Sequence, residues 1–197
     1  MSSKKEIGLF FGSFNPIHSG HLILANYVVE YTSMQELWFV VSPQNPFKRN
    51  DTLLPEIHRL AMVDRSIEKD HRFKVSNIEF GLPKPSYTSD TLAHLSEKHP
   101  NYKFSLIMGE DNLTYLHKWK NADFLINNYV IYVYPRPNSK ISHYGNIQSI
   151  QRLKAPMIEI SASFIRKAIK EQKDVSWFLP QGAFKYIDEM GFYKNRI

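Results

Sequence analysis

The chain has 197 residues, of which 43% are hydrophobic and none is cysteine, and its formal net charge is +6. The length predicts a single domain over residues 1–197 with its core at about 7–193. The lack of cysteine excludes disulfides and cysteine-bearing zinc sites. The polar start and the short apolar runs predict neither a secretory signal nor a membrane span, so we expect a cytoplasmic protein.

The positive charge indicates an anionic partner without identifying it. Nucleic acid, a membrane surface and small phosphates all have the required charge. Lys and Arg are scattered, with no run of four. A nucleic-acid binder more often carries a basic stripe with aromatic residues. We therefore favour small phosphorylated ligands over nucleic acid or membrane.

Short apolar runs alternate with segments of helical spacing along the chain. Runs rich in Val, Ile, Phe and Tyr predict strands at 7–11, 36–41, 73–80, 103–108, 128–134 and 157–160. Helices are expected at about 19–32, 55–69, 89–98, 111–127, 143–151, 163–172 and 181–190. This alternation predicts an α/β fold, a doubly wound Rossmann-like parallel sheet of about five to six strands with flanking helices.

Unusual residues follow the expected strands, at the edge where ligands bind in such folds. The first segment, GSFNPIHSGH at 12–21, places two histidines at a strand-to-helix junction. A helix that begins near Ser19 holds His18 and His21 within about one turn at its amino-terminal end. Free N–H groups make that end an anion site, and Gly20 lets the backbone approach another group.

Two other interpretations of these histidines were weighed. One is an ordinary surface or core role. The other is a metal site, but two histidines without an HExxH pattern supply too few ligands.

The first segment resembles the first signature of the nucleotidyltransferases that share an HxGH motif, which residues 18–21 match. ISASFIR at 160–166 resembles their second signature, usually ISxTxIR, with Ser163 in the common threonine position. Those enzymes join a nucleoside triphosphate to a phosphorylated acceptor and release pyrophosphate. The resemblance implies that His18, His21 and Arg166 are the catalytic phosphate ligands.

The second signature also has a physical logic of its own. Ser161 or Ser163 is a good cap for the helix that follows. Arg166 is then expected in the first turn, where the helix dipole disfavours a cation. A bound anion explains that placement, and pairing with a distant carboxylate is the alternative.

The resemblance implies an ATP site made by the loops after the strands. Its expected residues are Gly12, Ser13, Phe14, Gly20, Lys48, Gly109, Asp111, Arg136, Ser161 and Ser163. Lys48, with Arg49 as the adjacent candidate, is expected on a lid that brings a cation to the phosphates, and a solvated surface charge is the alternative. Asp111 is expected either to bind a ribose hydroxyl or to cap a helix.

Three further segments resemble one subfamily, the bacterial nicotinate-nucleotide adenylyltransferases: PSYTSDTL at 85–92, MGEDNLTYLHKW at 108–119, and 174–193. The resemblance implies ATP and nicotinate mononucleotide as substrates, and deamido-NAD and pyrophosphate as products. It implies Mg²⁺ held through ATP phosphates and water, with no protein metal ligands. Tyr87, Thr88 and Trp119 are the implied acceptor residues.

The residues of these segments support that interpretation. Thr88 or Ser89 is expected to cap a helix whose free N–H groups receive a carboxylate. Trp119 offers a flat face for an aromatic ring, unless it belongs to the core.

Several alternatives stay open. They are adenylyl transfer to nicotinamide mononucleotide or phosphopantetheine, and a non-catalytic phosphate- or RNA-binding module. The lack of a KMSKS-like segment argues against a class I tRNA synthetase, and the lack of GxGxxG after the first strand argues against an oxidoreductase. The oligomeric state is left open, a homo-oligomer included.

Overall fold

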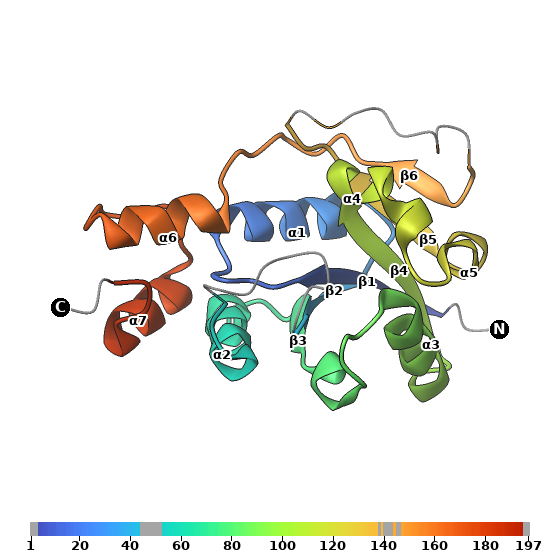
Figure 1. Cartoon of the computed structure of the whole chain (residues 1–197). Coiled ribbons are helices and arrows are strands. Elements are labelled where there is room, and N and C mark those ends of the chain that lie inside the picture. The colour runs from blue at the N-terminus through green and yellow to red at the C-terminus, as the bar shows by residue number, and fades with distance from the viewer. Residues whose placement is uncertain (1–3, 44–52, 138, 140–143, 145–146, 195–197) are drawn as a thin grey trace.

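A six-stranded parallel sheet forms the centre of the protein (Figure 1). The structure, a computed structural model, describes residues 4–43, 53–137, 139, 144 and 147–194. Its strands are β1 (Lys5–Gly12), β2 (Glu36–Val41), β3 (Phe73–Ser76), β4 (Tyr102–Gly109), β5 (Val130–Tyr134) and β6 (Ile150–Arg152). They pair in the order β3-β2-β1-β4-β5-β6, and every pairing is parallel. The order reverses between β1 and β4, the switch point at which such sheets bind ligands.

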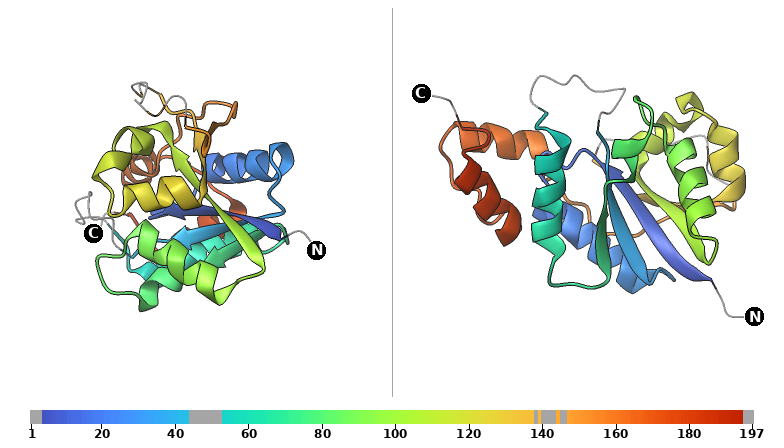
Figure 2. Two further views of the ribbon diagram at one scale, coloured as in Figure 1. Left: turned by 90° about the vertical axis from the view of Figure 1, so that its right-hand side faces the viewer. Right: turned by 90° about the horizontal axis from the view of Figure 1, so that it is seen from below.

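Helices cover both sides of this sheet, as the left view of Figure 2 shows. They are α1 (Ser19–Tyr31), α2 (Glu56–Ile67), α3 (Thr88–Lys98), α4 (Glu110–Thr114), α5 (Ala122–Asn128), α6 (Ala162–Lys170) and α7 (Gln181–Met190). Two 3₁₀ turns, η1 (Ile78–Gly81) and η2 (Leu116–Lys118), complete the described elements. None of the helices in the described ranges is long and apolar enough to cross a membrane.

The alternation of side chains along the strands divides the core into two clusters. In β1, Ile7 and Leu9 belong to one cluster and Phe10 to the other. The cluster around Phe10 includes buried residues of α1, α2, α6 and α7, and the cluster around Leu9 includes residues of α3, α4 and α5. The expected doubly wound α/β fold is therefore confirmed.

The sixth strand is where the sequence prediction was wrong. The chain forms β6 at Ile150–Arg152, which overlaps the end of the expected helix 143–151, and residues 157–160 have no regular secondary structure. Ile158 and Ile160 are half-buried because they line a small pocket beside His18, so their apolar pattern does not come from a strand. A strand of three residues carries too short a pattern to be recognised.

Two other expected elements are shorter than predicted. The expected strand 73–80 ends at Ser76 and continues into η1. The expected helix 111–127 is three pieces, α4, η2 and α5. The break before α5 falls at Asn121, which takes a left-handed conformation (φ 53°).

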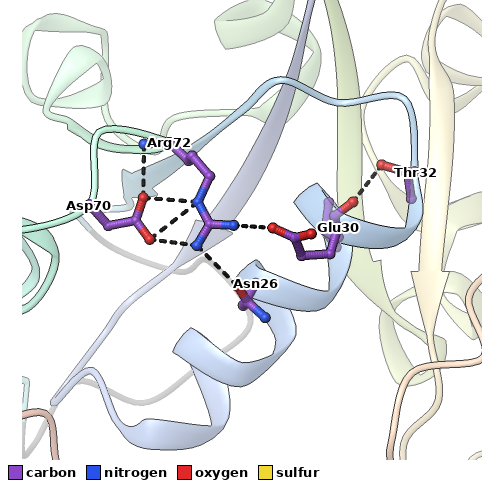
Figure 3. A network of polar contacts seen from close by, with 6 residues as sticks. Asn26, Glu30, Thr32, Asp70 and Arg72 are labelled. Carbon is purple, nitrogen blue, oxygen red and sulfur yellow. Dashed lines mark hydrogen bonds and ion pairs between the residues drawn. The ribbon is translucent and has the colours of Figure 1, made fainter.

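Paired charges occupy the amino ends of the strands. Arg72, just before β3, contacts Asp70 at 2.6 Å and Asn26 at 3.1 Å (Figure 3). It also pairs with Glu30 at the end of α1, and its hydrogen bonds to Asp70 lower the pKa of that carboxyl group. At the other edge, α6 and α7 lie beyond the carboxyl ends of the strands (Figure 1).

Candidate active site

A cleft of about 440 Å³ lies at the carboxyl ends of β1 and β5. We call it the carboxyl-edge cleft. It is lined by Phe10–Asn15, His18 and His21, Leu53, Asp111 and Asn112, Tyr134 and Arg136, Ile160–Ser163 and Arg166. The two expected signatures, more than 130 residues apart in the sequence, therefore meet in one cleft.

The two histidines sit at the start of α1, as the sequence predicted. His18 is the residue before the helix, and its ring stacks on that of His21 with 3.7 Å between ring centroids. The backbone N–H of His18 donates to Nδ1 of His21 at 3.1 Å. Because Nδ1 accepts this bond, a neutral His21 carries its proton on Nε2, which is then a hydrogen-bond donor.

His18 is buried, with 6% of its surface exposed. Burial, and secondly the charge of Arg136, lower the pKa of His18 to about 4. Its ring is therefore neutral at neutral pH. A Cβ at Gly20 would come within 3.1 Å of the His18 ring and 3.2 Å of Ile158, so glycine allows this packing. The expected close approach at Gly20 is confirmed, and the neighbour is the histidine ring.

The loop after β1 is shaped by an aromatic ring. Phe14 has a left-handed backbone (φ 45°), and its ring packs in the core against Phe10 and His21. A Cβ at Gly12 would come within 2.7 Å of that ring, so only glycine fits there. Gly12, Ser13 and Phe14 line the carboxyl-edge cleft, as expected of residues that bind ATP.

A buried arginine that the sequence analysis missed supports this loop. Arg59 of α2 is fully buried, and its guanidinium donates to the carbonyls of Ser13, Ser42, Pro43 and Leu54 at 2.7–2.9 Å. Burial lowers the pKa of Arg59. A signal was present: Arg59 stands three and four residues before buried apolar positions of α2, so it occupies the inward face of an amphipathic helix.

The second signature forms the start of α6. Ser161 is the N-cap, and its hydroxyl accepts a bond from the N–H of Phe164 at 3.2 Å, so the prediction of a serine cap is confirmed. Ser163 lies beside it, with 3.1 Å between the hydroxyls. Arg166 is the fifth residue of α6, so its expected place in the first turn was wrong. A cap at Ser161 starts the helix too early for that.

The Arg166 side chain lines the carboxyl-edge cleft and is hydrogen-bonded to the backbone of the first signature. Its Nη1 donates to the backbone carbonyl of Asn15 at 2.8 Å. No carboxylate of the described residues forms an ion pair with it. One guanidinium nitrogen is thus bound to the protein, and an anion is a fitting ligand for the others.

The cleft is also lined by residues of α4 and by residues at and just after the end of β5. Gly109 is the N-cap of α4, so the alternative that Asp111 caps a helix was wrong. Exposed Asp111 lies 3.8 Å from Nε of Arg136, and a Cβ at Gly109 would be 3.1 Å from Arg136 Cγ. Arg136 also donates to the Tyr134 hydroxyl at 3.1 Å. Gly109 therefore lets an acidic and a basic side chain share the rim.

The expected acceptor residues lie outside the lining of this cleft. Tyr87 is the N-cap of α3, which starts at Thr88 without a side-chain cap bond, so a cap by Thr88 or Ser89 was wrong. Ser89 is buried, and its hydroxyl lies 3.3 Å from Asp90. The amino end of α3 thus keeps backbone N–H groups that no side chain caps.

Trp119 precedes Lys120, which contacts residues at the amino end of α3. The Lys120 ammonium lies 4.7 Å from the Tyr87 ring centre and 2.8 Å from the Asp90 carboxylate. Trp119 itself is half-buried against the core cluster around Leu9. Part of its surface therefore belongs to the core and part is exposed, and its role in stacking stays a prediction.

Lys48 and Arg49 lie outside the described residues. Within the ranges that the structure describes, no three His, Asp or Glu side chains come together in a way that would hold a metal ion.

The comparisons with known proteins agree with this geometry. The family model described as "Cytidylyltransferase-like" matches residues 9–168. A protein of Christiangramia forsetii is 53% identical over 96% of this chain and 99% of its own length. One of Flavobacterium psychrophilum is 51% identical over 96% of this chain and its whole length. Both are named "Probable nicotinate-nucleotide adenylyltransferase".

A solved structure shares the fold. Nicotinic acid mononucleotide adenylyltransferase of Plasmodium falciparum, complexed with NaAD, superposes with a TM-score of 0.78, at 21% identity, over 96% of this chain and 97% of that chain. The chain is thus a nucleotidyltransferase of the cytidylyltransferase-like family. Within that family it belongs to the nicotinate-nucleotide adenylyltransferases.

Proposed function

We propose that the chain transfers the adenylyl group of ATP to nicotinate mononucleotide, which gives deamido-NAD and pyrophosphate in NAD biosynthesis. The observation that carries the proposal is the meeting of His18, His21 and Arg166 in the carboxyl-edge cleft. The family of the chain and the names of its relatives support the same reaction.

The chemistry requires charge stabilisation more than proton transfer. The attacking group is a phosphate monoester whose second pKa is near 6, so it is already ionised at neutral pH. No general base is needed. The difficulty lies in bringing two polyanions together and in stabilising charge on the transferred phosphorus and on the leaving pyrophosphate.

The cleft residues suit that task. The rings of His18 and His21 donate hydrogen bonds to phosphate oxygens, and neither acts as a base. Arg166 adds a positive charge with several N–H donors beside the amino end of α6. Gly12, Ser13 and Phe14 bring backbone close to the phosphates, and Asp111 and Arg136 contact the nucleoside end. Lys48 stays a predicted lid residue.

Mg²⁺ accompanies ATP in this proposal. Asp111 is the one carboxylate among the described residues that line the cleft, which fits an ion held mainly by phosphate oxygens and water. When bound, the ion supplies positive charge to the phosphates. The chain's own residues orient the triphosphate against the acceptor.

The acceptor is assigned to the amino end of α3. Uncapped backbone N–H groups there suit the carboxylate of nicotinate, and the exposed part of Trp119 stacks on the pyridine ring. A carboxamide would leave such donors poorly paired, at a cost of about 1–3 kcal/mol for each. Two donors predict a preference for nicotinate on the order of 10²-fold.

An acceptor panel tests the proposal. Purified protein is given ATP with nicotinate mononucleotide, nicotinamide mononucleotide or phosphopantetheine, and pyrophosphate release is measured. We expect the highest kcat/KM with nicotinate mononucleotide, and the Trp119→Ala variant should weaken both mononucleotides while the preference persists. Equal efficiency with both mononucleotides, or no release with any acceptor, contradicts the proposal.

Three further expectations stay predictions: that residues 1–197 form one domain, that the protein acts in the cytoplasm, and that its partners are these nucleotides, without nucleic acid or membrane. The oligomeric state is open.

A further inference from the structure

A residue near the C-terminus reaches the loop that carries the first signature. The hydroxyl of Tyr193 donates to Oδ1 of Asn15 at 2.7 Å, although 178 positions separate them in the sequence. Tyr193 does not line the carboxyl-edge cleft, whereas Asn15 does. The contact therefore connects the segment after α7 with a residue that lines the cleft.

The geometry of Tyr193 shows that this contact is built into the fold. Its backbone is left-handed (φ 64°), a conformation that bulky residues rarely adopt. Burial raises the pKa of the Tyr193 hydroxyl, so it stays protonated and keeps its proton to donate. Such a conformation persists only where the surroundings hold it.

Asn15 in turn is a junction of three segments. Its Oδ1 also accepts the N–H of Leu54 at 3.3 Å, and its backbone carbonyl accepts Nη1 of Arg166 at 2.8 Å. Two donors on Oδ1 set the direction of the Asn15 amide. The carbonyl of the same residue then sets where the Arg166 guanidinium lies.

We propose that Tyr193 is a positioning residue of the phosphate site, which acts through Asn15 on Arg166. The proposal rests on the proposed function in that Arg166 is taken as a phosphate ligand. It assigns the C-terminal segment a role in catalysis, although Tyr193 itself does not line the cleft.

The test removes one hydroxyl and keeps the ring. The variant is Tyr193→Phe, and the matched control is Tyr186→Phe. Tyr186 belongs to α7, and its hydroxyl pairs with Nδ1 of His58 at 2.9 Å, away from the cleft. Each variant loses one tyrosine hydroxyl contact of the C-terminal segment, so similar shifts in unfolding temperature are expected.

The expected difference is in catalysis and ATP binding. Tyr193→Phe should lower kcat/KM for ATP about 10-fold, because small displacements of a phosphate ligand are costly. The kcat/KM of Tyr186→Phe for ATP should stay within about twofold of the wild-type value. In an Arg166→Lys background, Tyr193→Phe should cost less than about twofold, because the hydroxyl acts through Arg166.

ATP binding by calorimetry gives a readout that does not depend on the acceptor. Weaker ATP binding in Tyr193→Phe than in Tyr186→Phe supports the positioning role even if the acceptor assignment fails. Equal ATP affinity and activity in the two variants overturn it. An undiminished effect in the Arg166→Lys background overturns it too.

A second variant covers the case in which Tyr193→Phe unfolds. Asn15→Ala removes the acceptor of the same bond, and it should reproduce the weaker ATP binding. Unchanged ATP binding in folded Asn15→Ala overturns the proposal.

Discussion

The two edges of the sheet treat charge in opposite ways. At the amino edge, buried Glu36 pairs with Lys74 at 3.0 Å and also with Lys5, and Arg72 pairs with Asp70 of its own loop and with Glu30 of α1 (Figure 3). At the carboxyl edge, Arg59 and Arg166 donate to backbone carbonyls, and no carboxylate of the described residues forms an ion pair with either. Arg136 on the cleft rim is the exception, because it lies 3.8 Å from Asp111.

This difference explains where the site lies. Paired charges at the amino edge compensate one another and leave little field for a ligand. At the carboxyl edge Arg166 is held in place by the Asn15 carbonyl and lines the cleft, so its positive charge stays available to a polyanion. A protein that binds triphosphate benefits from arginines whose partners are neutral.

The largest expected effect comes from the loss of Arg59, which hydrogen-bonds the loops at the carboxyl edge. Arg59→Met leaves four carbonyls without their buried donor, so the free energy of unfolding should fall by about 3–5 kcal/mol. The matched change at the amino edge, Arg72→Met, affects a partly exposed side chain and should cost under about 1 kcal/mol. Urea unfolding of both variants checks this. Similar losses would remove the contrast between the edges.

His21 tests whether the carboxyl edge is where the chemistry happens. His21→Ala should lower turnover roughly 10²–10³-fold, as for the loss of one preorganised donor to developing charge. KM should change less. His71→Ala, an exposed histidine at the amino edge, serves as the control and should keep normal turnover. Near-normal turnover in His21→Ala would refute its role as a phosphate ligand.

The burial of His18 at the carboxyl edge should make the stability of the protein depend on pH. The pKa of His18 is about 4 in the folded protein and near 6.5 in the unfolded chain, so the unfolded chain binds more protons between these values. Stability from a neutral His18 is therefore present above pH 6.5 and is lost as pH falls towards 4. The loss amounts to about 3 kcal/mol.

The measurement compares unchanged protein with His18→Gln from pH 7 to pH 4. The difference between their unfolding free energies should shrink by about that amount. A constant difference for His18→Gln would show that His18 is not held neutral.

The sequence predicted those parts of the molecule that depend on local signals. The start of α1 at Ser19 and the Ser161 cap follow from motifs of a few residues, and both are confirmed. The long-range hydrogen bonds that support the site could not be predicted from the sequence. The Arg59 bonds to Ser13 and the Tyr193 bond to Asn15 join residues 46 and 178 positions apart.

The errors have the same physical origin. A three-residue strand such as β6 is defined by its pairing with Ile131 of β5, and its own sequence has no period to reveal this. The amino end of α3 was assigned a side-chain cap because Thr88 and Ser89 are good caps, yet Ser89 is buried.

The smallest expected effect concerns Arg166, and it tests the nature of the contrast most directly. Arg166→Lys keeps the charge but loses the planar fork, and a single ammonium cannot hold the Asn15 carbonyl as the guanidinium does and also grip two phosphate oxygens. We expect kcat/KM for ATP to fall about 10-fold, equivalent to about 1.4 kcal/mol. Arg72→Lys at the amino edge should leave kcat/KM unchanged, because its ion pairs there need only a positive charge. If Arg166→Lys matched the unchanged protein in ATP affinity and rate, charge alone would suffice at the carboxyl edge, and the arrangement of donors around Asn15 would have no catalytic value.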